Sequence, residues 1–429
     1  MLKLERFRLR SFINSMNNVK LHSDGIFGEI TVPSSKSFAH RALIVAALSG
    51  KKITIHNIIF SDDIKATINA LENLGVVIKV SDDSVIVDGS GILRNSFVKI
   101  NANESGSTLR FMIPVVLMLG NKAVFDGKGR LPERPLNDYF EIFDKNSVEY
   151  IHPNGKFLPL EVKSGIDITT FEVKGNVSSQ FITGLMLCGM IKPVRINITT
   201  ELQSKPYVDI TVDVLRNFGC DVIENENSYE IIPKSTDINE YVVENDWSQA
   251  AFFMCAAAIN GDITVNNINV NSVQGDRKIV DLLKEFGADV TCGVNCVNVK
   301  KSEMYGIDID AGDIPDLVPV LSVLSCYARC RTRIYNASRL RLKESDRLKS
   351  MYDELSKLGA DIEIGEDYLV INGCNKLYGN DVDSHNDHRV AMSMAVASVG
   401  CEGSIILNGY NAVNKSYPTF FEDWRKLNE

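Results

Sequence analysis

Two kinds of helical segment recur along the chain, and their apolar positions tell them apart. The first kind has one apolar stripe, ends at a glycine and is followed by a strand-like run, as in ALENLGVVI around Gly75 and ELSKLGADI around Gly359. Further copies surround Gly219 and Gly287, while IFDKNSVEYI has Asn146 where glycine is expected, and FFEDWRKL is a sixth candidate. Glycine, and after it asparagine, best tolerates the left-handed backbone that ends such helices. We therefore expect Asn146 to be left-handed.

The second kind of helical segment is apolar or small all round and follows a polar cluster. A helix without a polar face must be surrounded by protein. Strand-like runs such as ITIHNI, SVIVDG, ITVNNI and YLVING lie between the helices. The pattern predicts six buried helices, which begin near Ser35, Gly106, Ser179, Trp247, Asp316 and Asp387.

Both kinds of helix return at a spacing of about 70 residues, so the chain is a sixfold repeat. Each repeat holds a buried helix, an amphipathic helix and several strands, which predicts an α/β (α+β) fold. We expect two globular domains of three repeats each. The alternative is a solenoid of six stacked units, but about 70 residues is long for a solenoid repeat.

Composition and charge narrow the class of protein. The 429 residues are 45% hydrophobic and 24% charged, which suits a globular chain of two or three domains. The formal net charge is −9 and no basic block is present, so we expect no nucleic-acid partner. The longest apolar runs fall below the ~18 residues of a membrane span, so we expect no membrane association.

The N-terminal segment and the cysteines point to the cytoplasm. The first fifteen residues are basic but lack the apolar core of a secretory signal, and we expect translation to start at Met16. Nine scattered cysteines suit a reducing compartment. Cys292/Cys296 and Cys326/Cys330 have a spacing that zinc sites use, but no histidine lies near either pair. We therefore expect no metal and no other cofactor.

The polar starts of the buried helices carry the candidate chemistry. Four of them are rich in polar side chains: Ser34-Ser35-Lys36-Ser37 followed by His40-Arg41, Glu104-Ser105-Gly106-Ser107 followed by Arg110, Ser178-Ser179-Gln180, and Asn386-Asp387-His388-Arg389. A cation in a first helical turn opposes the helix dipole at a cost of ~0.3–1 kcal/mol. Lys36 and Arg389 both do this at equivalent points of the repeat, which indicates an anion bound by the helix end and the side chain together. Taken singly, each Ser or Asp here is an ordinary N-cap.

Further cations and two acids lie in other loops and helix starts. RLPERPL holds Arg134 in a stiff loop, SKPYVDI offers Ser204, Lys205 and Tyr207, RLRLKESDR places Lys343, Glu344 and Arg347 around a helix start, and NKSYPTFF offers Lys415. The candidate anion ligands suit small substrates with several phosphate and carboxylate groups: Lys36, Arg41, Arg134, Lys343, Arg347, Arg389 and Lys415. Asp316 and Glu344, held beside cations, are candidate proton-transfer groups. The sequence contains no Walker, dinucleotide, HExxH or GxSxG motif.

Ten short runs, in order along the chain, resemble one known family. They are PSSKSFAHRAL, NESGSTLRF, RLPERPL, VSSQFITGLM, SKPYVDIT, QGD, IPDL, RLKESDRL, NDHRVAM and KSYPTFF. From about residue 20 to the C-terminus the chain closely resembles the 5-enolpyruvylshikimate-3-phosphate synthase family, also called 3-phosphoshikimate 1-carboxyvinyltransferases. Each run is weak alone, but ten in order are highly specific.

The resemblance implies a fold and a reaction. The family has two similar domains of three βαβαββ-type repeats around buried central helices, the inside-out barrel of the enolpyruvyl transferases. It implies one domain over residues 35–243, a discontinuous one over 1–34 and 244–429, and an active site in the cleft between them. The implied reaction transfers the enolpyruvyl group of phosphoenolpyruvate to the 5-hydroxyl of shikimate 3-phosphate and releases phosphate by addition and elimination. This is a step of the shikimate pathway toward chorismate and the aromatic amino acids, and we expect a monomer.

The resemblance also implies residue roles. Asp316 would take the proton of the attacking hydroxyl, and Glu344 would protonate the methylene carbon with help from Lys36. Shikimate 3-phosphate would be held by Lys36, Ser37, Arg41, Ser178, Ser179, Gln180, Ser204, Tyr207, Asp316 and Lys343. Phosphoenolpyruvate would be held by Lys36, Gly106, Arg134, Gln180, Arg347, Arg389 and Lys415.

The sequence departs from the family at a few positions and leaves two rival functions. Ser35, Glu104, Ser107 and Arg339 stand where Gly, Asn, Thr and Asn are more usual, and none of these changes removes a proposed catalytic group. One rival is the sibling enolpyruvyl transferase that acts on UDP-N-acetylglucosamine. That enzyme typically has a cysteine in the loop equivalent to RLPERP, whereas the first cysteine here is Cys188. The other rival is a non-catalytic anion-binding protein on the same fold.

Overall fold

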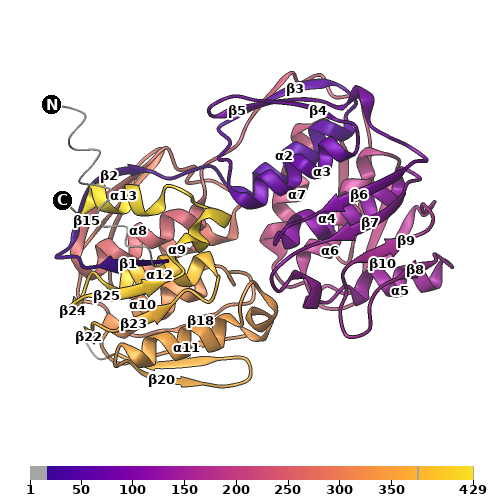
Figure 1. Ribbon diagram of the computed structural model, residues 1–429. Helices are drawn as coiled ribbons and strands as arrows, with labels where there is room; N and C mark the ends of the chain where they lie inside the picture. Colours follow the sequence, from indigo (N-terminus) through magenta and orange to yellow (C-terminus); the bar gives the residue numbers. More distant parts are fainter. Residues whose placement is uncertain (1–16, 374–375, 429) are drawn as a thin grey trace. The chain divides into compact units, whose positions relative to one another are not determined.

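The structure, a computed structural model, describes residues 17–373 and 376–428 and divides them into two compact units (Figure 1). The first unit contains residues 17–32, Trp247–Val270 and the described part of 276–429, and the second contains Pro33–Asp246 and Asn271–Gly275. Residues 1–15 and the expected start at Met16 lie outside the described residues. A division into two units, and not a stack of six, rules out the solenoid alternative.

The second unit is built from three copies of one strand–helix pattern. The first copy contains α2 (Lys36–Leu48), β3 (Lys52–His56), α3 (Asp62–Asn73), β4 (Val77–Val80) and β5 (Ser84–Asp88). The second contains β6 (Phe97–Asn101), α4 (Gly106–Met118), β7 (Lys122–Asp126), α5 (Asn137–Lys145), β8 (Tyr150–Ile151) and β9 (Leu160–Val162). The third contains β10 (Thr170–Val173), α6 (Ser179–Leu187), β11 (Val194–Ile198), α7 (Lys205–Asn217), β12 (Asp221–Asn225) and β13 (Ser228–Ile232).

The first unit repeats the pattern three more times. Its first copy contains β2 (Ile26–Thr31), α8 (Trp247–Asn260), β15 (Gly261–Asn266), α9 (Ile279–Glu285), β16 (Asp289–Cys292) and β17 (Cys296–Lys300). Its second contains β18 (Asp308–Asp310), α10 (Val318–Tyr327), β19 (Arg331–Tyr335), α11 (Arg347–Lys357), β20 (Asp361–Ile364) and β21 (Leu369–Asn372). Its third contains β23 (Asp381–Asp383), α12 (His388–Ala397), β25 (Ile405–Asn408), α13 (Phe420–Leu427) and β1 (Asn18–Leu21), beside a small pair of β22 (Leu377–Tyr378) and β24 (Cys401–Glu402).

Five four-stranded sheets share one strand order, and two of them borrow a strand from a distant part of the chain. In β6-β7-β9-β8, for example, the parallel pair β6–β7 is joined through the buried helix α4, and β9 and β8 follow antiparallel. In the first copy of the second unit the leading strand is β14 (Glu240–Val242), which pairs with β3. In the first unit β2 pairs with β15 in the same way. Each of these strands precedes a point where the chain passes from one unit to the other.

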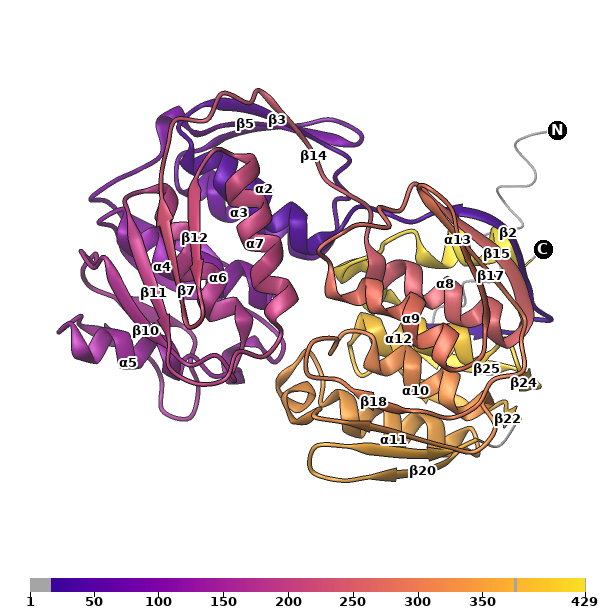
Figure 2. The same cartoon turned by 180° about the vertical axis from the view of Figure 1, so that it is seen from behind.

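The buried helices form the core of each unit. Helix α8 is buried over Trp247–Ile259 and α4 over nearly all its length, as expected for helices that are apolar all round. In the first unit α8, α10 and α12 pack on one another, and Figure 2 shows the sheets arranged around them. The structure starts the six buried helices at Lys36, Gly106, Ser179, Trp247, Val318 and His388, within two residues of the predicted starts.

The amphipathic helices end as the sequence predicts, with one exception. Gly75, Gly219, Gly287 and Gly359 all have positive φ. In the copy after α5, however, Asn146 has φ −111° and Ser147 has φ 54°. The prediction of a left-handed Asn146 is therefore wrong by one position. Asn146 caps the helix instead, because its side-chain amide donates to the Ile142 carbonyl at 2.8 Å.

The segment 271–275 belongs to the second unit although most of its neighbours in sequence belong to the first. The Gln274 amide donates to the Glu244 carboxylate at 2.7 Å and to the Asn245 carbonyl at 2.8 Å, and Ser272 also bonds Glu244. The sequence pattern did not predict that this segment belongs to the second unit.

Within the described part of the chain, no helix has the length and apolar character needed to cross a bilayer.

Candidate functional site

In the second unit, Lys36 begins α2 and faces an acid from the next helix. Its ammonium pairs with the Asp63 carboxylate at 2.8 Å, and its backbone N–H donates to Asp246 at 3.1 Å. The side chains of Lys36 and Asp63 are only 16% and 10% exposed. The helix start and the lysine side chain thus each bind a carboxylate, as expected of an anion-binding helix end.

Arg41 lies one turn further along α2 and is fully enclosed by hydrogen-bond acceptors. Its guanidinium donates to the Ser37 carbonyl at 2.7 Å, the Tyr207 carbonyl at 2.9 Å, and the hydroxyls of Thr211 and Thr183 at 2.8 and 3.1 Å. Burial lowers the pKa of Arg41 to about 9, so it remains a cation at neutral pH. Arg41 therefore ties α2 to α6 and α7, whose starts bear several of the other predicted ligands of shikimate 3-phosphate.

Most of the remaining predicted residues of the second unit sit on the starts of α4, α6 and α7, and Arg134 follows the short 3₁₀ helix η3 (Leu131–Glu133). Gly106 packs so closely on Arg134 that a methyl group built on it would lie 2.5 Å from the guanidinium. The Gln180 amide bridges two neighbours, since it accepts from Arg110 and donates to the Ser107 hydroxyl, both at 3.0 Å. The other predicted ligands lie at the same helix starts: Ser178 caps α6, Ser179 is its first residue, and Ser204 and Tyr207 stand at the start of α7.

In the first unit the predicted residues gather around the Asp316 carboxylate. Asp316 lies two residues before α10, and both its oxygens are paired: Oδ1 with Arg347 at 2.8 Å and Oδ2 with Arg389 at 2.8 Å. Lys343 Nζ lies 3.9 Å from Oδ1. Arg389 also donates to the Ser248 hydroxyl at the start of α8, at 3.0 Å. Polar side chains at the N-terminal ends of the three buried helices of this unit are therefore bonded to one another.

Arg347 is the centre of this charge cluster. Its side chain is 2% exposed and binds three carboxylates: Asp316 at 2.8 Å, Glu344 at 2.7 Å and Asp387 at 2.8 Å. Asp387 in turn accepts from the Arg389 backbone N–H at 2.9 Å and so caps α12. The two predicted proton-transfer acids, Asp316 and Glu344, are thus held by the same guanidinium.

Lys415 lies in the last repeat of the first unit, after strand β25. It ends a short 3₁₀ helix, η7 (Tyr410–Lys415), and its ammonium donates to the Asn386 carbonyl at 2.6 Å. Asn386 directly precedes Asp387. The structure therefore places Lys415 beside the turn that leads into α12.

Charge and burial set the protonation states in the first unit. Burial favours a neutral carboxyl at Asp316, but Arg389, Lys343 and Arg347 outweigh it and hold the pKa of Asp316 well below its usual range. Burial lowers the pKa of Lys343 to about 8, although the negative charge of Asp316 raises it; repulsion from Arg347 adds to the lowering. At neutral pH the cluster therefore contains ionised Asp316 beside three cations.

The capping interpretation of the helix starts holds in part. The side chains of Ser105, Ser178 and Asp387 accept from backbone N–H groups of their own helices, whereas Ser35 makes no such bond. Sequence reasoning did not identify Asp63, Ser248 or the role of Asp387 as partner of Arg347. Asp63 stands in the acidic start of α3, which by sequence alone is typical of any helix N-terminus.

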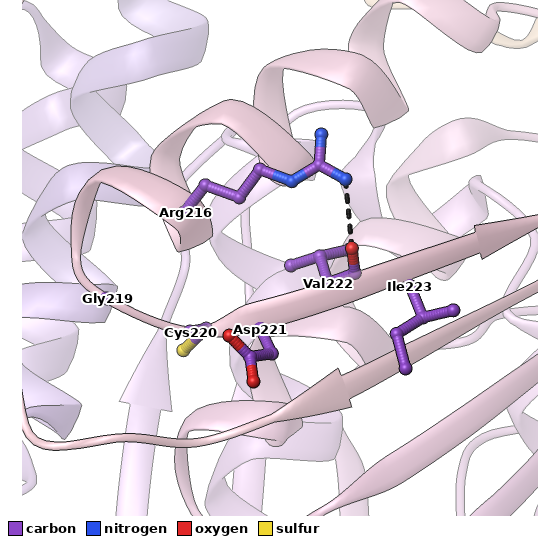
Figure 3. Close-up of a pocket in the computed structure, with 6 residues that line it drawn as sticks. All are labelled: Arg216, Gly219, Cys220, Asp221, Val222 and Ile223. Carbon is purple, nitrogen blue, oxygen red and sulfur yellow. Dashed lines mark hydrogen bonds between the residues drawn. The ribbon is translucent and has the colours of Figure 1, made fainter.

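The geometry favours binding of anions with several charged groups, and proton transfer beside them. No group of three or more His, Cys, Asp or Glu side chains in the described ranges is arranged to hold a metal ion. A hollow of about 490 Å³ where α7 leads into β12 is lined by Arg216, Gly219, Cys220, Asp221, Val222 and Ile223 (Figure 3). Its Arg216 is engaged with the Val222 carbonyl at 2.9 Å, and no predicted site residue lines it. The candidate chemistry therefore lies at the helix starts.

Comparison with known proteins decides the family. Residues 22–424 match the family model described as EPSP synthase (3-phosphoshikimate 1-carboxyvinyltransferase). The chain belongs to the EPSP synthase family. A 3-phosphoshikimate 1-carboxyvinyltransferase of Clostridium novyi is 46% identical over 96% of this chain and 98% of its own length, and that of Clostridium acetobutylicum is 45% identical over 96% and 97%.

Solved structures share the fold of this family member. An EPSP synthase structure from Acinetobacter baumannii has a TM-score of 0.78 at 24% identity and covers 95% of this chain and 98% of its own. The enolpyruvyl transferase NikO from Streptomyces tendae has a TM-score of 0.73 at 14% identity, with 96% and 97% covered. The predicted fold class, two repeat-built domains with buried central helices, is confirmed.

Proposed function

We propose that this protein transfers the enolpyruvyl group of phosphoenolpyruvate to the 5-hydroxyl of shikimate 3-phosphate and releases inorganic phosphate. Membership of the family supports this activity, as do relatives of matching length named 3-phosphoshikimate 1-carboxyvinyltransferase. The observation that carries it is the arrangement of Asp316 and Glu344 on a single buried guanidinium, that of Arg347. Two acids fixed side by side among cations suit a reaction that moves protons beside anionic substrates.

The proposed roles divide between the two units. Arg347, Arg389 and Lys415 of the first unit, with Lys36, Gly106, Arg134 and Gln180 of the second, would hold phosphoenolpyruvate. Shikimate 3-phosphate would be bound by Lys343 and Asp316 of the first unit and by Lys36, Ser37, Arg41, Ser178, Ser179, Gln180, Ser204 and Tyr207 of the second. Both sets would act on one pair of substrates. The cations would offset the repulsion between two anionic reactants and orient them for reaction.

The chemistry follows in two steps. In the addition, Asp316 takes the proton of the 5-hydroxyl while the hydroxyl oxygen attacks C2 of phosphoenolpyruvate. Glu344 gives a proton to C3 in the same step. In the elimination, the C2–phosphate bond breaks, phosphate leaves, and a proton returns from C3 to the protein with Lys36 assisting. Carboxylates near C2 stabilise the positive charge that builds there when C3 is protonated.

The protonation state of Asp316 fits this role. It is ionised, as a base must be, although its cationic neighbours make it a weak base in the unliganded protein. Anionic substrates would draw part of the charge of Arg389 and Lys343 away from Asp316. Its pKa would then rise and strengthen it as a base at the moment when the hydroxyl is present.

Phosphate release from purified protein tests the proposal. We expect release with phosphoenolpyruvate and shikimate 3-phosphate, and none when UDP-N-acetylglucosamine replaces shikimate 3-phosphate. Silence with both acceptors would leave a binding protein on the same fold.

We also propose a monomer in the cytoplasm. In the part of the chain that the structure describes, eight cysteines are present as free thiols, which supports a reducing compartment. Light scattering after size exclusion would test the monomer.

A further inference from the structure

The turn that leads into α12 has an unusual backbone. His385 and Asn386 are consecutive and both have positive φ, 51° and 54°. The Asp387 N–H donates to the Ser384 carbonyl at 2.9 Å, which closes a turn with two left-handed central residues, the arrangement of a type I′ turn. Glycine and asparagine usually fill such positions, and histidine at the first of them is strained. Strain of this kind persists only where the surroundings hold it, and it collects at functional sites.

A buried carboxylate from α11 holds the turn. Glu354 is 1% exposed and accepts from His385 Nε2 at 2.7 Å, from the Asp383 backbone N–H at 3.0 Å and from Lys357 at 2.8 Å. Glu354 lies two turns along α11 from Arg347, which binds Asp387 at the far end of the same turn. One helix therefore clamps the turn at both ends.

The same turn sets the surroundings of two cations of the proposed phosphoenolpyruvate site. The Asn386 carbonyl accepts from Lys415, and the Asp387 carboxylate accepts from the Arg389 backbone N–H. The Ser384 hydroxyl donates to the Gly409 carbonyl at 2.9 Å, where the segment that ends in Lys415 begins. A change in the turn would therefore move Lys415 directly and α12 at its first residue.

We propose that Glu354 and His385 are positioning residues: their pair holds residues 384–387 in the left-handed turn that places Lys415 and Arg389 for phosphoenolpyruvate. This inference rests on the proposed function of those two cations. Neither Glu354 nor His385 contacts Asp316 or Lys343 in the hydrogen bonds and ion pairs of the described residues. Binding of shikimate 3-phosphate should therefore be largely independent of the pair.

The substitution His385→Gly isolates the pair without straining the fold. Glycine accepts positive φ at low cost, so the turn remains accessible while the bond to Glu354 is lost. We expect the KM for phosphoenolpyruvate to rise roughly tenfold, the effect of a modest displacement of binding groups. We expect kcat to change less, and the dissociation constant of shikimate 3-phosphate alone to stay within about twofold. His385→Lys, which restores a cationic donor to Glu354, should recover most of the lost affinity.

Two matched controls separate positioning from general damage. Lys349→Ala removes the exposed pair with Asp353 on the same helix α11, and Asn267→Gly relieves another left-handed residue of the first unit. Both should leave the KM for phosphoenolpyruvate unchanged. An unchanged KM in His385→Gly would overturn the inference, as would equal losses for both substrates or a failure of His385→Lys to recover affinity.

Calorimetry with an unreactive phosphoenolpyruvate analogue on protein saturated with shikimate 3-phosphate makes the test independent of turnover. If the unmodified protein releases no phosphate, the proposed function fails. The inference then stands or falls on whether His385→Gly weakens the calorimetric binding of the phosphoenolpyruvate analogue. No difference in binding between the two proteins would overturn it.

Discussion

Lys36 occupies a position where the helix dipole disfavours a cation, and Asp63 compensates for it at 2.8 Å. In the proposed reaction Lys36 contacts both substrates and assists proton transfer. We expect Lys36→Met to abolish phosphate release and to weaken phosphoenolpyruvate binding, because methionine keeps the length of the side chain but carries neither charge nor proton. Steady-state phosphate release measures the first effect and calorimetry the second.

The control for this substitution is Lys65→Met on α3. Lys65 forms an exposed pair with Asp62 at 3.9 Å, so its loss removes one lysine charge outside the proposed site. It should leave turnover unchanged. Near-normal turnover in Lys36→Met would remove Lys36 from the mechanism.

Lys343 gives the binding of shikimate 3-phosphate a pH dependence. Burial lowers its pKa to about 8, so the ammonium is intact below that pH and is lost above it. Only the cationic form attracts the substrate anion, and affinity should therefore fall by about tenfold per unit above pH 8. Fluorescence or calorimetric titration between pH 6.5 and about 9.5 would measure the change.

An arginine at the same position provides the comparison. Lys343→Arg keeps its charge throughout this range, so its affinity should no longer decline above pH 8. A wild-type affinity that is flat to pH 9.5 would contradict the role of Lys343.

At the scale of elements, the start of α4 depends on the absence of a side chain. A methyl group at Gly106 would lie 2.5 Å from the Arg134 guanidinium, so Gly106→Ala must push that side chain away. We expect the KM for phosphoenolpyruvate to rise about tenfold. The melting temperature should hardly change, because the atoms displaced are the end of a flexible side chain. Unaltered KM together with wild-type stability would show that Arg134 is not a ligand at this position.

The ion pair between α11 and the start of α12 is a stability element as well as part of the site. Asp387 is fully buried and pairs with Arg347, so Asp387→Ala leaves a buried guanidinium short of one partner and removes the cap of α12. Loss of one partner of a buried pair costs roughly 3–5 kcal/mol of unfolding free energy. Urea unfolding should reveal this loss, whereas Lys349→Ala, on the exposed face of α11, should unfold like the wild type. If Asp387→Ala has the same unfolding free energy as the Lys349→Ala control, the carboxylates of Asp316 and Glu344 alone satisfy Arg347.

The sequence pattern was sufficient to predict the buried helices, because the burial of a helix is recorded in the apolar residues along its whole length. Helices α4 and α8 have no polar face, and their polar starts mark where each begins. Single positions were less predictable. The left-handed residue after α5 is Ser147 and not Asn146, since the Asn146 amide finds a better partner in the Ile142 carbonyl.

Side-chain partners between repeats lay beyond sequence reasoning. The cations of the candidate site were visible as residue types, but the pairing of Lys36 with Asp63 or of Arg347 with Asp387 depends on how neighbouring helices pack. The Glu354–His385 pair has no signal at all in sequence, because a glutamate on an amphipathic helix is usually exposed. The pairing of β2 with β15 and of β14 with β3 also joins segments far apart in the chain, which local pattern cannot reveal.

At the scale of the whole molecule, each unit carries its own set of cations. Lys36, Arg41 and Arg134 belong to the second unit, and Lys343, Arg347, Arg389 and Lys415 belong to the first. Like charges repel, and substrate anions that bind both sets would replace repulsion with attraction. We therefore expect the protein to become more compact when shikimate 3-phosphate and an unreactive phosphoenolpyruvate analogue bind together.

Small-angle scattering measures this change directly as a smaller radius of gyration. The control is Lys36→Met with the same ligands, because loss of one of the cations proposed to contact both substrates should reduce the compaction. A high-salt series should weaken the effect in the wild type, since screening acts on the same charges. Identical scattering profiles with and without both ligands, in a protein that turns over its substrates, would show that the two sets of cations act without closure of the units.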